Sequence, residues 1–381
     1  MKRLLTPPGI ILLTTLLSFG FWIFPDFGIL RKGFKPIIPS FSIGFFVAVL
    51  WYSIAMVSSL LGFHLGRKIK ADSLIFDKVA DLKSDVPYYV LSFISALGVI
   101  ATFFVIYTSA GNSLNQIWIW VSSGNANKLK QALYEDYNVG ILSLRYAAIH
   151  SACMALVRRF IHKKKRKIDI INIMSLIWIA LISTRLAVIA CALAFFIFYN
   201  AYRKINLGLK RSILLIVIGF HILSIFNYTR NINFYRQFGM GFYSAGFSEI
   251  VTYVGSPFQG AISVAENYRF IKSNPSGWNF YAGIEPALST NSSFLELFVL
   301  YGWNCFLFSS IGLFFLALIA GIFEKFKSNY MYLVFTALMY GFAEFWRIFL
   351  FNKGILLTLV AVPFIVCTIS FLLRLMPIWK K

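Results

Sequence analysis

The run FLELFVLYGWNCFLFSSIGLFFLALIAGI, residues 294–322, contains one charged residue, Glu296. A helix needs about 20 apolar residues to cross the ~30 Å hydrocarbon core of a bilayer, so this run predicts a membrane-spanning helix. Similar runs recur along the chain, which is 59% hydrophobic and only 13% charged. In a soluble domain about a quarter of the residues are charged. The predicted fold is therefore all-α, a single polytopic integral membrane domain covering residues 1–381.

Hydropathy predicts about ten transmembrane helices, and the basic residues predict their orientation. Loops rich in Lys and Arg face the cytoplasm, and most of the 36 Lys and Arg residues fall in alternate connections. This pattern predicts cytoplasmic termini and one large outer loop, 229–292, between spans seven and eight. The expected spans are about 8–24, 41–65, 88–110, 140–157, 169–183, 186–202, 212–228, 294–322, 331–350 and 354–376.

The net charge of +22 would suggest a nucleic-acid partner in a soluble protein. Here most of the charge follows from membrane topology, so no nucleic acid is expected. The block RRFIHKKKRK, residues 158–167, is interpreted as an anchor against anionic membrane lipid. The chain shows no P-loop, no Rossmann glycine pattern and no HExxH motif, and its four cysteines lie within apolar runs. These absences argue against a nucleotide or zinc enzyme, and no cofactor or metal is expected.

The 229–292 loop is polar and rich in aromatic residues, and it opens with TRNINFYRQFGMGFY. Rings such as Tyr235 and Tyr253 can stack on sugar faces, and they can equally pack the loop onto the membrane surface. Glycines such as Gly241 give the backbone freedom for close turns. The loop is thus a candidate for sugar contacts and for a lid.

Charged residues inside spans usually face a protein interior or a water-filled cavity. With the predicted orientation, all such residues that we singled out fall in the outer third of the membrane. This depth favours a site open to the outside over an ion or proton pathway, although each residue could instead snorkel to the interface. The residues are Arg145, Arg185, Glu296, Glu344 and Arg347.

Arg185 and Arg230 are expected at the level of the lipid headgroups, with Arg236 close by in sequence. An arginine fork binds phosphate oxygens and stays charged at physiological pH. Two or three arginines could stabilise a phosphate leaving group without a metal; anchoring to phospholipid headgroups is the alternative. Because the loop contains no histidine, Glu266 is the candidate general base, and a salt bridge with Arg269 is an equally good interpretation.

These features resemble the Wzy-type polymerases of bacterial O-antigen or capsule repeat units, distant relatives of the O-antigen ligases. The similarity rests on the many spans with a late large loop and on the ISTR turn that ends at Arg185. It also rests on the run from Arg230 to Gly241, an arginine separated from a glycine by ten residues, and on TNSSFLELFVLYGW at 290–303. Ligases are expected to use a histidine in the large loop, so its absence favours a polymerase.

The resemblance implies a GT-C-like architecture in the bacterial inner membrane, with the active site facing the periplasm. It implies an inverting, metal-independent glycosyl transfer between two undecaprenyl-diphosphate-linked oligosaccharides, donor and acceptor. Arg185, Arg230 and Glu266 would be catalytic. Substrate binding would involve Arg236, Gly241, Tyr235, Tyr253, Arg145, Arg347 and Glu344.

Three alternatives stay open: a ligase, a flippase or transporter of the same lipid-linked glycans, and a structural or regulatory membrane protein. A flippase is expected to carry charged or polar residues deep within its spans, whereas the charged residues named above all fall in the outer third. The sugars, the linkage and the binding of a chain-length regulator stay open.

Overall fold

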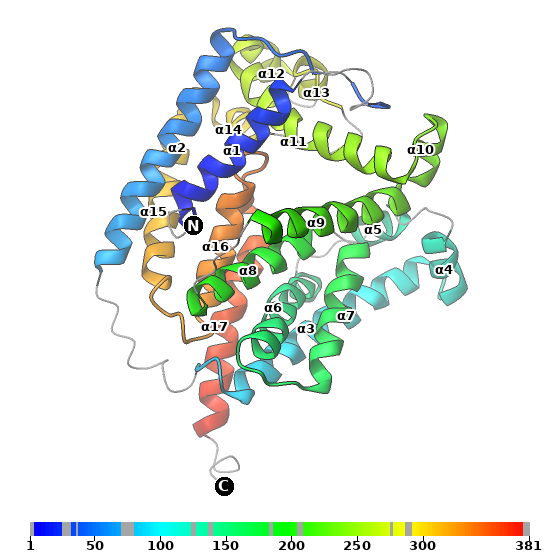
Figure 1. Ribbon diagram of the computed structural model, residues 1–381, viewed down its shortest axis with the longest axis vertical. Coiled ribbons are helices and arrows are strands. Elements are labelled where there is room, and N and C mark those ends of the chain that lie inside the picture. The colour runs from blue at the N-terminus through cyan, green and yellow to red at the C-terminus, as the bar shows by residue number, and fades with distance from the viewer. Residues whose placement is uncertain are drawn as a thin grey trace. The chain divides into compact units, whose positions relative to one another are not determined.

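The computed structural model describes residues 4–24, 32–35, 37–69, 80–122, 127–135, 140–182, 186–203, 209–274, 277–285 and 292–375. These residues form helices joined by turns (Figure 1), and the only strand-type pairing among them is an isolated bridge between Asp81 and Asn329. The all-α prediction is confirmed for this part of the chain. The chain divides into two compact units. The first unit is Met1–Ile69, Phe234–Ile322 and Gly341–Phe351; the second is Lys70–Asn233, Phe323–Tyr340 and Asn352–Lys381.

Four helical segments are long and apolar enough to cross a membrane, and they expose large apolar side chains such as Phe46 (65%) and Phe93 (64%). Lipid can cover such side chains, so the chain has transmembrane character. The number of spans and their orientation stay predictions. The four segments are Ile43–Lys68, Asp85–Ser109, Ser293–Phe323 and Gly354–Leu375. Shorter apolar helices are Pro7–Ile23, Leu186–Tyr202, Val217–Thr229 and Tyr332–Glu344.

In the first unit, helices α1, α2 and α11 pack against one another, and α14 packs against α11. The start of α1 follows from its sequence: Thr6 caps the helix by accepting the N–H of Gly9 at 3.4 Å. Prolines then occupy its first two positions, where a helix needs no backbone donor. The helices that lie wholly or mostly in this unit are α1 (Pro7–Ile23), α2 (Ile43–Lys68), α10 (Ile232–Gln237), α11 (Phe242–Glu266), α12 (Tyr268–Ser273), α13 (Trp278–Tyr281), α14 (Ser293–Tyr301), η4 (Gly302–Asn304) and α15 (Cys305–Phe323).

The predicted loop 229–292 contains a 25-residue helix, α11, whose middle is buried. Small residues let this helix approach its neighbours: a Cβ at Gly255 would stand 3.1 Å from the backbone of Phe21. Polar side chains tie the same surfaces together, because the indole N–H of Trp22 donates to Gln259 Oε1 at 2.7 Å. Hydropathy alone ranks this stretch as polar, whereas its small and hydrogen-bonded residues allow it to form part of the core.

Two glycines one helical turn apart, Gly62 and Gly66, bring α2 into contact with the backbone of α15. A Cβ at either position would stand 2.0 Å from a carbonyl oxygen, that of Phe314 or of Leu318. This spacing is the GxxxG pattern by which membrane helices approach closely.

We expect Gly62→Ala to destabilise the protein by about 1–3 kcal/mol, as overpacking does, because backbone atoms cannot rotate out of the way as a side chain can. Gly312→Ala on α15 is the matched control, since no atom beyond its chain neighbours and the nearby backbone of its own helix lies within 4 Å of its Cβ position. That control should be neutral or stabilising by up to about 1 kcal/mol. Thermal unfolding in detergent, followed by circular dichroism, measures both. Equal melting temperatures for the two variants would contradict the close packing.

In the second unit, α3 packs against η1, α6, α7 and α17. Gly98 on α3 allows η1 to cross it, since a Cβ there would stand 2.1 Å from the backbone nitrogen of Arg145. The helices of this unit are α3 (Asp85–Ser109), α4 (Leu114–Ser122), α5 (Asn127–Glu135), η1 (Ile141–Tyr146), α6 (Ala147–Phe160), α7 (Lys167–Ile182), α8 (Leu186–Tyr202), α9 (Leu209–Arg230) and α17 (Gly354–Leu375). Helix α16 (Tyr332–Glu344) lies partly in each unit, and η5 (Leu350–Asn352) ends at their boundary.

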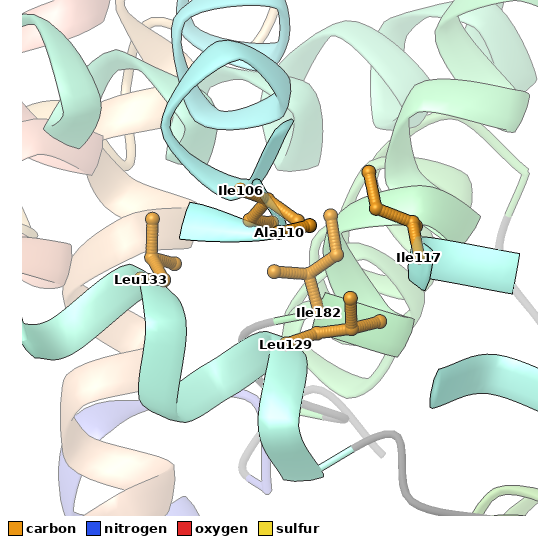
Figure 2. Packing of buried hydrophobic residues seen from close by; sticks show 6 residues of the cluster. All are labelled: Ile106, Ala110, Ile117, Leu129, Leu133 and Ile182. Atoms are coloured by element: carbon orange, nitrogen blue, oxygen red, sulfur yellow. The ribbon is translucent and has the colours of Figure 1, made fainter. Parts of the chain in front are cut away.

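Helices α4 and α5 fold back onto the end of α3. Figure 2 shows the apolar cluster that joins them, with side chains from α3, α4, α5 and α7 directed toward one another. Burial of such side chains holds these short helices in place, because a nine-residue helix is marginal by itself in water. The buried members of the cluster are Ile106, Ala110, Ile117, Leu129, Leu133 and Ile182.

Candidate functional site

The two arginines predicted to hold the donor diphosphate are not defined by the structure. Arg185 lies outside the described residues, and Arg230 is the last residue of α9 with its side chain outside the described part. Their roles stay predictions.

The predicted base, Glu266, is exposed at the end of α11, and its carboxylate accepts a hydrogen bond from the hydroxyl of Ser42. The alternative salt bridge with Arg269 is not among the ion pairs of the described residues. Arg269 instead turns to Tyr268, donating from Nε to the hydroxyl at 3.0 Å. Glu266 therefore keeps contact with solvent, as a base that serves an incoming substrate must.

Arg236 and Gly241 are both exposed, near the start of α11. Gly241 has an ordinary φ of −78° and precedes the first residue of the helix. The position that needs glycine is Gly239, whose φ is 59°. The conformation that only glycine adopts easily is therefore found at Gly239 and not at Gly241, where it was expected.

Arg145 is completely buried in η1 of the second unit. Its guanidinium donates to the carbonyl of Leu142 at 3.0 Å and to the hydroxyl of Tyr146 at 2.9 Å, and it lies 4.6 Å from the centre of the Tyr146 ring. These contacts hold the 3₁₀ turn together. They give Arg145 a structural function in addition to any contact with substrate.

Glu344 and Arg347 form a buried ion pair, with exposures of 6% and 5%. The sequence placed both on one face of a helix over 331–350, but α16 ends at Glu344 and Arg347 lies in the following turn. The ion pair joins residues at i, i+3, and the helix is shorter than expected.

Side chains from other helices explain why α16 ends here. The hydroxyl of Tyr52 on α2 donates to the carbonyl of Trp346 at 3.0 Å. The N–H of Phe349 donates to Glu296 Oε2 on α14 at 3.0 Å. These side chains satisfy backbone groups that a longer helix would pair internally, as burial in an apolar unit requires.

Helix α11 supplies the third member of the site. The Arg347 guanidinium donates to the hydroxyl of Tyr253 and lies 5.2 Å from the centre of its ring. Glu249, one turn earlier on α11 and 3% exposed, accepts from the hydroxyl of buried Tyr235. Glu249 and Tyr253, at i and i+4, therefore continue a polar line along one side of α11.

We call Tyr253, Glu344 and Arg347 the buried polar site. Its guanidinium is fixed by a carboxylate and a tyrosine, and this preorganisation is what recognition of a sugar hydroxyl or phosphate oxygen requires. Tyr253 is half-buried and is the member nearest to solvent. The structure thus brings together three of the predicted binding residues. Among the described residues no group of three or more His, Cys, Asp and Glu side chains is placed to hold a metal ion.

The sequence interpretation missed a second buried polar group, here called the Asp169 network. Asp169 on α7 accepts from the hydroxyl of Tyr88 at 2.5 Å and from the backbone N–H of Arg166 at 2.8 Å. Asn172 donates to the Tyr88 hydroxyl at 3.0 Å and to Ser92 at 2.8 Å. The signal was an Asp and an Asn three residues apart at the start of an apolar run, which places both on one helix face.

Comparison with known proteins adds no relative: no family model, no curated protein and no solved structure matches this chain.

Proposed function

We propose that this chain polymerises undecaprenyl-diphosphate-linked oligosaccharide repeat units by inverting glycosyl transfer at the periplasmic face of a bacterial inner membrane. The observation that supports this proposal best is the buried polar site, Tyr253, Glu344 and Arg347, within an apolar helical unit. Charges in such surroundings are costly, and in membrane proteins they usually mark a functional site. The class of reaction comes from the sequence resemblance.

In the proposed reaction, a hydroxyl of the acceptor sugar attacks the anomeric carbon of the donor glycan. A new glycosidic C–O bond forms while the bond to the diphosphate breaks, so the anomeric configuration inverts. Arg185 and Arg230 hold the departing diphosphate, with Arg236 assisting, and Glu266 takes the hydroxyl proton. Undecaprenyl diphosphate leaves as the other product. The buried polar site binds sugar or phosphate oxygens of the substrates.

The purified protein, supplied with a synthetic undecaprenyl-diphosphate repeat unit in detergent micelles, should produce longer lipid-linked oligomers. Mass spectrometry of the extracted lipid measures them. A ligase would leave the single unit unchanged until a lipid A core acceptor is added. A flippase would leave it unchanged in micelles and move it across the bilayer of a vesicle.

Arg185→Ala and Arg230→Ala should each slow elongation by at least about tenfold. Removal of one hydrogen-bond donor to a developing anion typically slows a reaction by about 10²–10³-fold, so this expectation is the smaller of the two. Arg269→Ala is the matched control, because this arginine is exposed and its hydrogen bond and its cation–π contact are both with the neighbouring Tyr268. Polysaccharide ladders on a gel, from cells that depend on the variant, report the result. Intact ladders for both Arg185→Ala and Arg230→Ala would refute their assignment.

A further inference from the structure

The cations of the basic block 158–167 divide into those that contact the start of α3 and those that do not. Arg158 is fully buried, donating to Asp85 and to the carbonyl of Ser84 at 3.3 Å. Arg166 reaches Asp85 at 3.1 Å, and Lys164 donates to the carbonyl of Lys83 at 2.9 Å. These three cations fasten the segment to the start of α3.

Three of the four remaining cations of the block line a cavity. Arg159, Phe160, Lys163 and Lys165 line a surface cavity of about 550 Å³, and all four side chains are exposed. No ion pair or hydrogen bond joins the side chains of its three cations to any described residue. Arg158, Lys164 and Arg166 differ in this respect, since each contacts the start of α3. We call these four residues the basic cavity.

The backbone at Lys163 adopts an unusual conformation just after the end of α6. Its φ of 59° is left-handed, and among the described residues only Asn112 shares this conformation without being glycine. Asparagine adopts it readily, whereas a lysine there is uncommon and strained, and such strain gathers at ligand-binding positions. The turn directs Lys163 into the cavity and is closed by the Lys164 N–H, which donates to the Arg158 carbonyl at 2.9 Å.

The surroundings carry an excess of positive charge. His162, beside Lys163, has a pKa below its ordinary value, first because it is partly buried and then because Lys83, Arg158 and Lys164 lie near it, while Asp81 acts in the opposite direction. An anion in the cavity would compensate this charge.

An apolar surface begins next to the cavity. Phe160 is 49% exposed. Helix α7, which starts two residues after Lys165, exposes Ile170 (59%), Ile171 (59%) and Met174 (58%). Exposed apolar side chains beside three cations are complementary to a ligand that has an anionic headgroup and hydrocarbon tails.

We propose that the basic cavity binds the headgroup phosphate of an anionic glycerophospholipid, whose acyl chains lie along α7. Arg159, Lys163 and Lys165 bind the phosphate oxygens, and Phe160 covers the glycerol end of the tails. The site is distinct from the proposed glycosyl-transfer site and does not depend on it. The proposal replaces a general attraction to anionic lipid by binding at a preformed site. Arg158, Lys164 and Arg166 hold the segment that forms this site.

The test uses delipidated full-length protein and native mass spectrometry with dioleoyl-phosphatidylglycerol. The triple variant Arg159→Gln, Lys163→Gly, Lys165→Gln should lose about a hundredfold in affinity, from about 1 kcal/mol per cation near a membrane surface. Glycine at 163 accepts the left-handed φ, so the variant keeps its turn. Its melting temperature should stay at or above that of the wild type.

The control is Arg269→Gln with Lys272→Gln, which removes two exposed cations of the first unit and should keep the affinity. Dioleoyl-phosphatidylcholine should bind weakly, and inorganic phosphate at the same concentration should not displace the phosphatidylglycerol. Unchanged phosphatidylglycerol affinity in the triple variant would overturn the site. Equal binding of phosphatidylcholine would overturn the anionic headgroup, and displacement by inorganic phosphate would overturn the lipid as ligand.

Discussion

Glu344→Gln is expected to lower the free energy of unfolding by about 3–5 kcal/mol, the usual loss when one partner of a buried ion pair is removed. Glu344 and Arg347 are 6% and 5% exposed, so water cannot replace the missing carboxylate. The glutamine amide can accept a hydrogen bond from the guanidinium, but it brings no negative charge. The buried cation of Arg347 is then no longer compensated by its partner at i, i+3.

The converse variant, Arg347→Met, should cost less than Glu344→Gln. A carboxyl group left in apolar surroundings can take up a proton and become neutral, whereas a guanidinium stays charged at any accessible pH. Tyr253→Phe removes only the hydroxyl that Arg347 contacts and should cost about 1.5–3 kcal/mol, as for a hydrogen bond to a charged group. Unfolding in detergent, by heat or by added denaturing surfactant, ranks the three variants. Equal losses of unfolding free energy in Glu344→Gln and Arg347→Met would contradict the expectation that the unpaired arginine costs more than the unpaired carboxyl group.

The double variant Glu344→Leu with Arg347→Met separates stability from function. Replacing a buried ion pair by apolar residues of similar size is often neutral or stabilising by about 1–4 kcal/mol. A folded double variant that no longer elongates lipid-linked glycan would place the pair in substrate binding. A double variant that elongates at the wild-type rate would show that the pair is structural and would remove the main structural support for the proposed function.

Hydropathy found most of the long apolar helices but not where every one of them ends. The runs at 41–65, 88–110 and 354–376 correspond to α2, α3 and α17. The helix predicted over 331–350 ends at Glu344. Beyond it, the side chains of Tyr52 and Glu296 form hydrogen bonds with the backbone of the following turn. A hydropathy window cannot distinguish a helix from an apolar turn whose polar groups are paired by distant side chains.

The candidate site was predictable only where its residues are close in sequence. Glu344 and Arg347 stand at i, i+3, a spacing that brings side chains close together, and they form an ion pair. Tyr253 lies 94 residues from Arg347, so its contact depends on how α11 packs. That packing relies on small residues such as Gly255, which hydropathy scores as polar or neutral. Arg185 and Arg230 remain sequence predictions.

The largest effect expected in the second unit is that of Asp169→Ala, about 2–4 kcal/mol. Asp169 is 1% exposed and stands three residues after Arg166. Its carboxylate accepts a hydrogen bond from the backbone N–H of Arg166 at the start of α7. Loss of such a helix cap costs about 0.5–2 kcal/mol. The substitution also leaves the hydroxyl of Tyr88, a fully buried residue, without its acceptor, which costs about 1–3 kcal/mol. Asp169→Asn keeps an acceptor oxygen and should cost less.

A double-mutant cycle with Tyr88→Phe tests whether the Asp169 network acts as one unit. In the Tyr88→Phe background the hydroxyl is absent, so Asp169→Ala should cost only the helix cap. The two substitutions should then be coupled by at least about 1 kcal/mol, within the range for residues in one hydrogen-bond network. Additivity to within about 0.5 kcal/mol would show that Asp169 stabilises α7 through its cap alone. Coupling would mean instead that the starts of α3 and α7 are held together by the buried hydroxyl, because Tyr88 belongs to α3 and Asp169 to α7.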